Sequence, residues 1–483
     1  MDRWFGGASS APLIQTRFDS LDRRGEAVTF FMILLWCGVA VGPRSLVELG
    51  TIPIAATLLI RAVFVLWTDR ATGLAALRTA FFHWTSFLAL LWALWMMLTL
   101  SWSVAPDAKQ GWQEIANGRW AGLLIPALAL CSPRILRAGL TTLACAITVA
   151  AAVVLLEWAA FHTIAPDSGL AALRTSLLWS HPPEPNGVVT RFSGWWNQPA
   201  VGGAMLVAGI GFLLPALVHP GTTRLARAGT FLGLALSLFA LLLTGARGAW
   251  ISCVATFALF TLAIALSAWS RSATPATRPK LKATFSAIAV GGLVIVGALA
   301  AITPVRTLVT DRIQEGIREV TDFQTGRDVN SFTGTRLAMA GWAVAAAKER
   351  PLTGVGAGAF EPFVRQHLTS QGIDPTSRRV MSQAHNTALH ALATTGLIGL
   401  GLLIATVATA VIRSFRAETS LRAAHDNWPA FSPAWGLIAL CLHSVFDTIY
   451  VNQSTAALAC TFVALSIALS AKAQDPLRFA ESP

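Results

Sequence analysis

Charged residues are scarce in this chain: 12% of its 483 residues are Asp, Glu, Lys or Arg, whereas 54% are hydrophobic. Soluble globular proteins carry about twice that charged fraction, so the composition argues against a water-soluble fold. Paired cysteines are also missing, because the six cysteines all lie in apolar segments and form no CxxC pair. They are typical of small core residues, and they indicate neither a disulfide framework nor a zinc site.

Several catalytic motifs are absent as well. The chain contains no DxD, HExxH, GxxxxGK[ST] or GxSxG sequence. Metal-dependent sugar-nucleotide transfer, zinc proteolysis, ATP hydrolysis and serine-elbow acyl transfer therefore lack their usual groups. The net charge of +12 comes from basic residues scattered between apolar segments, so no nucleic acid partner is expected. Any chemistry should depend on arginine and histidine, with no cofactor and no metal ion.

Long apolar runs recur along nearly the whole chain. A helix of about 20 apolar residues crosses the hydrocarbon core of a bilayer. We therefore predict an all-α polytopic membrane protein with about 12 transmembrane helices, whose first helix is an uncleaved anchor because polar residues precede it. The expected spans are residues 27–44, 50–67, 83–102, 117–131, 138–161, 198–218, 229–243, 249–268, 284–303, 386–411, 433–449 and 454–471.

The distribution of basic residues predicts the orientation of these spans. With the N-terminus in the cytoplasm, the cytoplasmic loops and tails carry most of the Lys and Arg. The short outer loops then carry few, namely Arg44, Lys109, Arg174, Arg191 and Arg247. This asymmetry agrees with the positive-inside rule.

The same spans divide the chain into five parts. In order, they are a cytoplasmic N-terminal segment, nine helices, an outer helical loop, three helices and a cytoplasmic tail, at residues 1–26, 27–303, 304–385, 386–471 and 472–483. Within the loop, Thr335–Glu349 has apolar residues at helical spacing and ends before Arg350 and Pro351. A proline ends a helix, so we expect a helical cap over the membrane domain.

One candidate site is the short outer turn at Leu243–Trp250, LTGARGAW, in which small residues flank Arg247. Small neighbours let an anion approach closely, and the amides that begin the next helix add partial positive charge. The alternative is an interfacial arginine that only reaches toward lipid headgroups.

A second candidate is His385, followed by Asn386, where the long outer loop re-enters the membrane. An imidazole at a water interface can accept a proton near neutral pH. The alternative is a hydrogen-bonded histidine at a helix start. His390 lies five residues further on, so it does not share a helical face with His385.

Arg191 and Arg336 form the third candidate site. The first lies in TRFSGWWN, which ends at Asn197, and the second lies at the start of the expected cap helix. Arginine forks match phosphate oxygens in two-point contacts, so two or three arginines could hold a pyrophosphate. For each residue taken singly, a solvated loop charge is the alternative.

Four segments in order resemble the O-antigen ligase and O-antigen polymerase superfamily of bacterial envelope glycosyltransferases. They cover about residues 190–405 and read FSGWWNQPAVGGAML, LLLTGARGAWIS, TRLAMAGWAVAAAKERPLTGVGAGAF and AHNTALHALATTGLIGLGLL. The resemblance implies a glycosyltransferase-C-like helical fold in the bacterial inner membrane, with a periplasmic helical loop and an active site facing the periplasm. It also implies transfer of a glycan from undecaprenyl pyrophosphate to a sugar hydroxyl of lipid A-core, in lipopolysaccharide biosynthesis.

The resemblance also suggests residue roles. The family's arginine after the LTG turn falls on Arg247, its loop arginine on Arg336 and its histidine on His385. We expect the histidine to take the proton of the acceptor hydroxyl, and these two arginines with Arg191 to neutralise the departing pyrophosphate, in an inverting, metal-independent reaction. We expect substrate contacts from Asn386 and Asn197.

Three alternatives stay open at this point. An O-antigen polymerase shares donor and chemistry, and a protein O-glycosyltransferase is a further relative that commonly carries a soluble extension after its last span. From another class, twelve spans would also suit a lipid-linked oligosaccharide transporter. Charges inside the expected spans are chiefly Arg61, Glu157 and Asp447, and they form no chain across the bilayer, which disfavours ion or proton transport.

Overall fold

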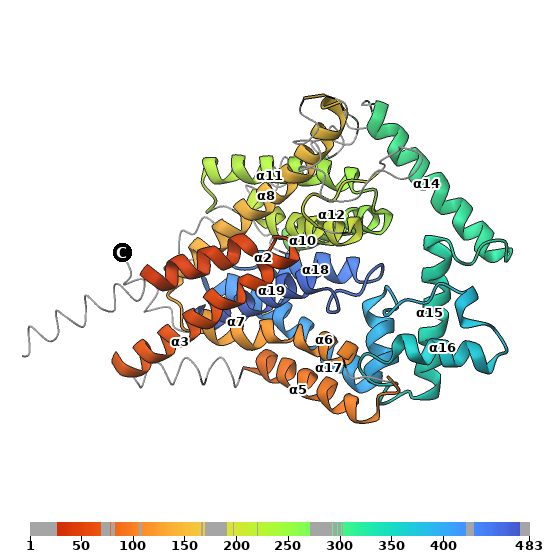
Figure 1. The fold of residues 1–483 in the computed structure, drawn as a ribbon. Coiled ribbons are helices and arrows are strands. Elements are labelled where there is room, and N and C mark those ends of the chain that lie inside the picture. Colours follow the sequence, from red (N-terminus) through yellow and green to blue (C-terminus); the bar gives the residue numbers. More distant parts are fainter. Residues whose placement is uncertain are drawn as a thin grey trace, which may run out of the picture.

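The protein was analysed as a computed structural model, in which every regular element that is described is a helix (Figure 1). The description covers residues 27–68, 78, 83–105, 109–165, 168–169, 191–196, 198–219, 221–270, 292, 297, 301, 303–421 and 429–473. The all-α prediction therefore holds for these residues. The expected span at 284–303 lies almost entirely outside them.

Seven described helices are long and apolar enough to cross a membrane. They are α5 with the 3₁₀ turn after it (Trp84–Trp102), α8 (Pro133–Thr163), α10 (Pro199–Val218), α11 (Arg224–Leu243), α12 (Arg247–Ser270), α17 (Thr387–Leu421) and α19 (Gln453–Ala473). Each overlaps an expected span, which is consistent with a polytopic membrane protein. The count of twelve spans is not confirmed.

Two expected spans form helices that are too short for a full crossing. Residues 117–131 form α7 (Arg119–Ala129), with Pro126 inside it, and residues 433–449 form α18 (Ser432–His443). At 1.5 Å per residue these helices are about 16 and 18 Å long, against a hydrocarbon core of about 30 Å. Hydropathy did not predict the short length of these two helices, because it measures the apolar content of a segment. The ends of the helices are set by turns in the chain.

The remaining membrane-side helices are shorter or lie at the edge of the bundle. An apolar helix at Ala27–Val39 is followed by α2 (Arg44–Leu49) and α3 (Thr51–Thr68). The helix α6 (Lys109–Ala116) precedes α7.

The centre of the bundle is α10, in which nearly every residue is buried. Its glycines permit close helix packing: a Cβ on Gly211 would lie 2.5 Å from the carbonyl oxygen of Trp435 in α18, and one on Gly209 would lie 2.5 Å from Ile147 in α8. Small residues at helix crossings allow such approaches in membrane proteins. The core around α10 therefore fixes where the outer ends of α11, α12 and α18 lie.

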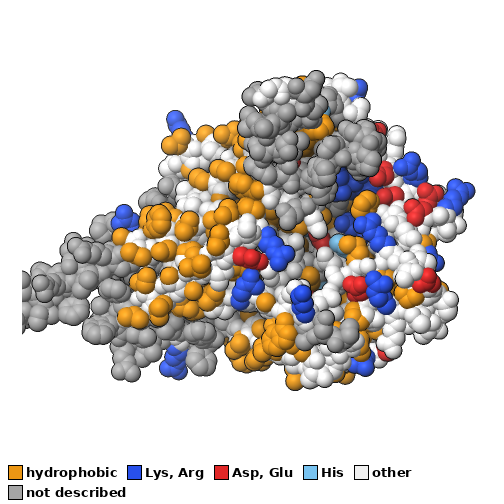
Figure 2. Space-filling view, in the orientation of Figure 1, with side chains coloured by type: hydrophobic (Ala, Val, Ile, Leu, Met, Phe, Trp, Pro, Cys, Tyr) orange, Lys and Arg blue, Asp and Glu red, His pale blue; other side chains and the backbone are white. Residues whose placement is uncertain are grey.

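Three helices lie together at one end of the bundle: α14 (Thr303–Gln324), α15 (Phe332–Glu349) and α16 (Phe360–Ser370) (Figure 1). The expected helix at Thr335–Glu349 is confirmed as α15, which begins three residues earlier because the Ser331 hydroxyl accepts a hydrogen bond from the Gly334 amide. Figure 2 shows many charged side chains over this end, whereas hydrophobic side chains predominate over the rest of the visible bundle, where a smaller group of charged side chains also lies.

The helix α17 is broken at Gly396, whose φ of 69° and ψ of −172° are accessible only to glycine. The PLTGVGAGAF segment lies across the break. The amides of Leu397 and Ile398 donate to the carbonyls of Pro351 and Leu352, at 2.9 and 3.4 Å. The Val355 and Gly356 amides donate to carbonyls just before the break, both at 2.9 Å. The segment thus satisfies backbone groups that the break leaves unpaired.

Candidate functional site

The turn between α11 and α12 is built from small residues that allow close packing. Gly245 has a φ of 60°, a left-handed conformation that costs glycine little, and it follows the end of α11. A Cβ on Gly248 would lie 2.6 Å from the Cβ of Phe446. Gly248 is therefore small because it packs against the loop after α18. The sequence had instead suggested that the small residues let an anion approach Arg247.

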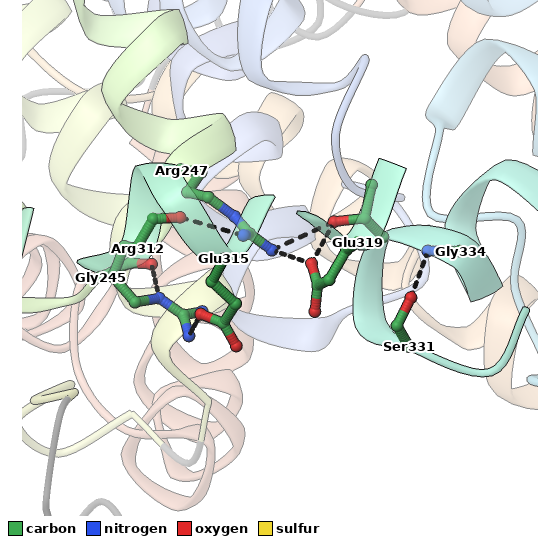
Figure 3. A network of polar contacts seen from close by, with 8 residues as sticks. Gly245, Arg247, Arg312, Glu315, Glu319, Ser331 and Gly334 are labelled. Atoms are coloured by element: carbon green, nitrogen blue, oxygen red, sulfur yellow. Dashed lines mark hydrogen bonds and ion pairs between the residues drawn. The ribbon is translucent and has the colours of Figure 1, made fainter. Parts of the chain in front are cut away.

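Arg247, the first residue of α12, reaches across to α14 and α15 (Figure 3). Its Nη2 donates to Glu319 Oε2 at 2.6 Å and to Thr333 Oγ1 at 3.1 Å, and its Nη1 donates to the Arg312 carbonyl at 3.1 Å. Three of the five guanidinium N–H donors are therefore engaged. The arginine predicted to bind phosphate also ties the outer helices to the membrane bundle.

Glu319 and Arg312 extend this network on α14. Burial alone would raise the pKa of Glu319, but hydrogen bonds from Thr333 and Arg247, together with the charges of Arg247 and Arg312, hold that pKa below its ordinary value. Arg312 Nε donates to the Gly245 carbonyl at 3.4 Å, and its guanidinium pairs with Glu315. The sequence did not single out these three α14 residues, because no motif surrounds them.

Arg191 lies in the same group of charges. Its Nε donates to the Thr244 carbonyl at 3.3 Å. Burial, and after it the charges of Arg312, Arg336 and Arg247, lower its pKa to about 10. A group with this pKa stays protonated at neutral pH, so the cluster holds mutually repelling cations.

Arg336, in the first turns of α15, completes the cluster. Burial lowers its pKa and the charge of Arg247 adds to that effect, whereas Asp447 and Glu319 oppose it. Among the described residues, Arg191 makes one side-chain hydrogen bond and Arg336 makes none. Both guanidinium groups thus keep donors for an incoming anion, and the predicted arginines do lie together.

His385 lies two residues before α17 begins, with a φ of 49° that is uncommon for any residue but glycine. Its Nδ1 lies 3.1 Å from Asp447 Oδ1, and only about a tenth of each side chain is exposed. A carboxylate can only accept, so Nδ1 carries a hydrogen, and in the neutral imidazole the lone pair is on Nε2. Strained backbone conformations of this kind cluster at functional sites.

Asp447 was expected inside a transmembrane span, and this placement was wrong. The helix α18 ends at His443, so Asp447 lies in the loop that leads to α19. Burial would raise the pKa of Asp447, but the hydrogen bond from His385 and the charges of His385, His443 and Arg336 lower it overall. A charged residue in an apolar segment is by default a functional candidate, which is the signal that sequence reasoning had available.

The loop after α18 is bound to the start of α17, which fixes Asp447 beside His385. The Thr387 hydroxyl donates to the Asp447 carbonyl at 2.9 Å and accepts from the Ile449 amide at 3.0 Å. The Thr387 amide donates to the Ser444 carbonyl at 2.8 Å. The imidazole and the carboxylate are therefore oriented by backbone contacts.

Of the two asparagines predicted to contact substrate, the structure describes Asn386 alone. Asn386 caps α17, because its Oδ1 accepts from the Leu389 amide at 2.9 Å while its Nδ2 donates to the Val445 carbonyl at 3.1 Å. Its amide thus has a structural use at this helix end. Asn197 lies outside the described residues.

A second histidine, His390, is buried and contacts the backbone next to His385. The Ala384 amide donates to His390 Nδ1 at 3.4 Å, and His390 Nε2 lies 3.5 Å from a carboxylate oxygen of Glu114 on α6. His390 and Glu114 are buried. This pair supports the backbone beside His385 from inside the bundle.

An apolar cavity of about 400 Å³ opens between α5, α17, α18 and α19. Its lining is mostly aliphatic and aromatic, and it reaches Thr387 and Ser444, which adjoin His385 and the Asp447 loop. Such a cavity suits a hydrocarbon chain. Among the described residues, no three His, Cys, Asp or Glu side chains gather as metal ligands.

A sequence model of the O-antigen ligase family matches residues 232–404. This part of the chain is therefore similar to the O-antigen ligase family. The matched segment includes Arg247, Arg312, Arg336 and His385, whereas Arg191 and Asp447 lie outside it. No curated protein sequence matches the chain. The family match and the seven apolar helices both support a multi-pass membrane protein.

Proposed function

We propose that this protein is an O-antigen ligase, which transfers a glycan from undecaprenyl pyrophosphate to a hydroxyl of lipid A-core on the periplasmic face of the inner membrane. The observation that carries the proposal is the His385–Asp447 hydrogen bond beside Arg336, whose charge environment includes Asp447 and Arg247. A general base and a group of cations are the parts that transfer from a pyrophosphate requires.

The acceptor hydroxyl attacks the anomeric carbon of the donor as its proton moves to His385 Nε2. The bond between that carbon and the pyrophosphate oxygen breaks, so the configuration inverts and lipid pyrophosphate leaves with the bonding electrons. Asp447 orients the imidazole through Nδ1 and stabilises its positive charge after proton transfer. A positioned base contributes about 10²- to 10⁴-fold to the rate.

The arginines act on the leaving group. Arg191 and Arg336 have donors available for phosphate oxygens, and cations placed against developing charge usually supply the largest part of the barrier reduction. Arg247 adds charge while three of its donors hold α14 and α15 in place. Because pyrophosphate is already a good leaving group, this scheme needs neither a general acid nor a metal ion.

The apolar cavity supports a lipid-linked donor. It lies among α5, α17, α18 and α19 and ends beside Thr387, the residue that holds the Asp447 loop. A polyprenyl tail in this cavity would place its pyrophosphate next to His385 and the arginines. The donor's lipid and its phosphates would thus be bound by neighbouring parts of the same bundle.

The test is transfer by purified protein in lipid nanodiscs, given undecaprenyl-pyrophosphate-linked O-antigen and lipid A-core. Ligase activity produces glycosylated lipid A-core and free undecaprenyl pyrophosphate in equal amounts. Longer lipid-linked glycan without ligation would identify a polymerase, and no covalent product would leave transport as the function. In cells, loss of a ligase leaves lipid A-core undecorated, whereas loss of a polymerase leaves single repeat units attached to it.

A further inference from the structure

The side chain of Arg247 lies directly against the backbone of α14. A Cβ on Gly316 would lie 2.7 Å from Arg247 Nη1 and 3.2 Å from its Cδ, so a larger residue would not fit there. Arg312 precedes Gly316 by one turn of α14, and Glu319 follows it by one turn. Both accept a hydrogen bond from the guanidinium, through a backbone carbonyl and a carboxylate (Figure 3). These contacts fix the orientation of the guanidinium.

The two forks of an arginine share one nitrogen. A phosphate meets either Nη1 and Nη2 at the end of the guanidinium, or Nε and Nη2 along its side. In Arg247, Nη2 donates to Glu319 Oε2 at 2.6 Å and to Thr333 Oγ1 at 3.1 Å. Because Nη2 carries two hydrogens, both are engaged. A two-point phosphate contact with Arg247 therefore requires one of these partners to leave.

Glu319 is the partner that an anion would replace. Burial would raise the pKa of Glu319, but hydrogen bonds from Thr333 and Arg247 and the nearby charges lower it overall, so the carboxylate is charged at neutral pH. A phosphate presents the same kind of anionic oxygen, so it competes for the same N–H groups. Replacement of one anion by another keeps the charge of Arg247 paired.

The other arginines of the cluster bear on this competition. Burial lowers the pKa of Arg191 and of Arg336, and the charge of Arg247 contributes in the same direction. A diphosphate has two anionic groups, so it can contact more than one of these arginines at once. Several cations around one diphosphate favour tight binding, and a tightly bound product leaves slowly and limits turnover.

We propose that Glu319 is an internal competitor for a diphosphate at Arg247. Its carboxylate leaves Arg247 when the phosphates of the lipid-linked donor bind, and it returns as lipid pyrophosphate departs after transfer. Glu319 thereby limits the affinity of the arginine cluster for the product and speeds its release. The identity of donor and product rests on the proposed function, whereas the competition between a carboxylate and a diphosphate does not.

The first test measures the binding of inorganic pyrophosphate to the protein in lipid nanodiscs. Glu319→Gln keeps the size of the side chain and removes its charge. Glu361→Gln is the matched control, because Glu361 pairs with Arg365 on α16. Glu319→Gln should bind pyrophosphate about tenfold more tightly than the wild type and the control, because a neutral amide is a weaker partner for a guanidinium. Equal or weaker binding by Glu319→Gln, or no binding by any of the proteins, would overturn the inference.

A second variant leaves the carboxylate unchanged. Thr333→Val removes the hydroxyl that donates to Glu319 Oε2 at 2.5 Å and accepts from Arg247. The carboxylate then has less support beside Arg247, and one Nη2 hydrogen is released, so pyrophosphate should bind about threefold more tightly. Thr369→Val is the control, because the Thr369 hydroxyl donates to a carbonyl of its own helix. Weaker binding by Thr333→Val would count against the inference, and thermal unfolding shows whether each variant is folded.

Kinetics test the role in product release. Undecaprenyl pyrophosphate added to the reaction should inhibit Glu319→Gln at about tenfold lower concentration than the wild type. The rate of a single turnover should stay at least as high as in the wild type. A lower single-turnover rate would instead mean that Glu319 only orients Arg247. Tighter pyrophosphate binding without any glycan transfer would support the competition at Arg247 and contradict the proposed function, so the two can fail separately.

Discussion

At the scale of single residues, the arginines of the cluster are not equivalent. Arg247 gives three donors to Glu319, Thr333 and the Arg312 carbonyl, whereas Arg191 has one hydrogen bond and Arg336 has none among the described side chains. Lysine keeps the charge but loses the two-point fork. The effect of a lysine at each place therefore depends on which donors the arginine still has available.

Arg191→Lys should lower kcat/KM for the lipid-linked donor about tenfold to hundredfold, which corresponds to one charge-assisted hydrogen bond. Arg365→Lys is the matched control, because Arg365 is exposed on α16 and, among the described residues, forms its ion pair with Glu361. The measurement is initial-rate kinetics in nanodiscs. A rate for Arg191→Lys that equals that of the control would mean that no fork contact with phosphate exists there.

Asp447 allows a pH prediction. Its pKa is lowered in the folded protein, so its carboxylate stabilises the fold above the ordinary value near 4, and this contribution is lost as the pH falls through the folded value. Asp447→Asn should therefore melt at a lower temperature than the wild type between pH 5 and 8. Below about pH 4 the difference should shrink. A difference that stays the same as the pH falls well below 4 would mean that the Asp447 carboxylate does not stabilise the fold.

At the scale of the elements, the break in α17 joins the outer helices to the bundle. The PLTGVGAGAF segment pairs with backbone groups on both sides of Gly396, and a Cβ there would lie 2.2 Å from the Leu352 carbonyl oxygen. These backbone hydrogen bonds fix the position of α17 relative to the segment, and His385 stays beside Asp447 only if that position is kept. The motif that carried the family resemblance thus has a physical role in the fold.

Gly396→Ala should destabilise the protein by about 3 kcal/mol, because alanine can neither adopt this conformation nor fit the space. Gly401→Ala on the same helix is the control, since no atom lies within 4 Å of its ideal Cβ. It should be neutral or slightly stabilising. Thermal unfolding in detergent measures both, and equal melting temperatures would contradict the role of the break.

The sequence predicted elements better than their junctions. Hydropathy located all seven long apolar helices, and apolar spacing with a proline stop located α15. The lengths of α7 and α18 were missed, because the turns that end them are set by tertiary contacts such as those between Thr387 and the Asp447 loop. The arginines and His385 could be chosen by residue chemistry and family pattern. Arg312, Glu319 and Asp447 became visible only when the fold brought distant segments together.

At the scale of the whole molecule, the outer end of the bundle carries like charges that a bound anion would neutralise. Burial and then the charges of three neighbouring arginines lower the pKa of Arg191, so the cluster contains repulsion that phosphate oxygens would relieve. A ligand that binds only the folded state raises the melting temperature. Inorganic pyrophosphate at about 100 times its Kd should stabilise the protein by about 2.7 kcal/mol.

This stabilisation should be largely lost in Arg336→Met and kept in Arg365→Met. Sodium sulfate at equal ionic strength is the salt control, because a general salt effect would act on all three proteins alike. A shift of the same size in the wild type and Arg336→Met would place the anion elsewhere.

The most direct measurement compares wild type, His385→Ala and the control His367→Ala, which changes a histidine on α16. Each protein is mixed with lipid-linked O-antigen and lipid A-core in a single turnover, and the release of undecaprenyl pyrophosphate is followed with time. The predicted result is a rate for His385→Ala that is 10²- to 10⁴-fold below both others, with donor binding unchanged. A His385→Ala rate equal to that of the wild type would contradict the assignment of this histidine as the base.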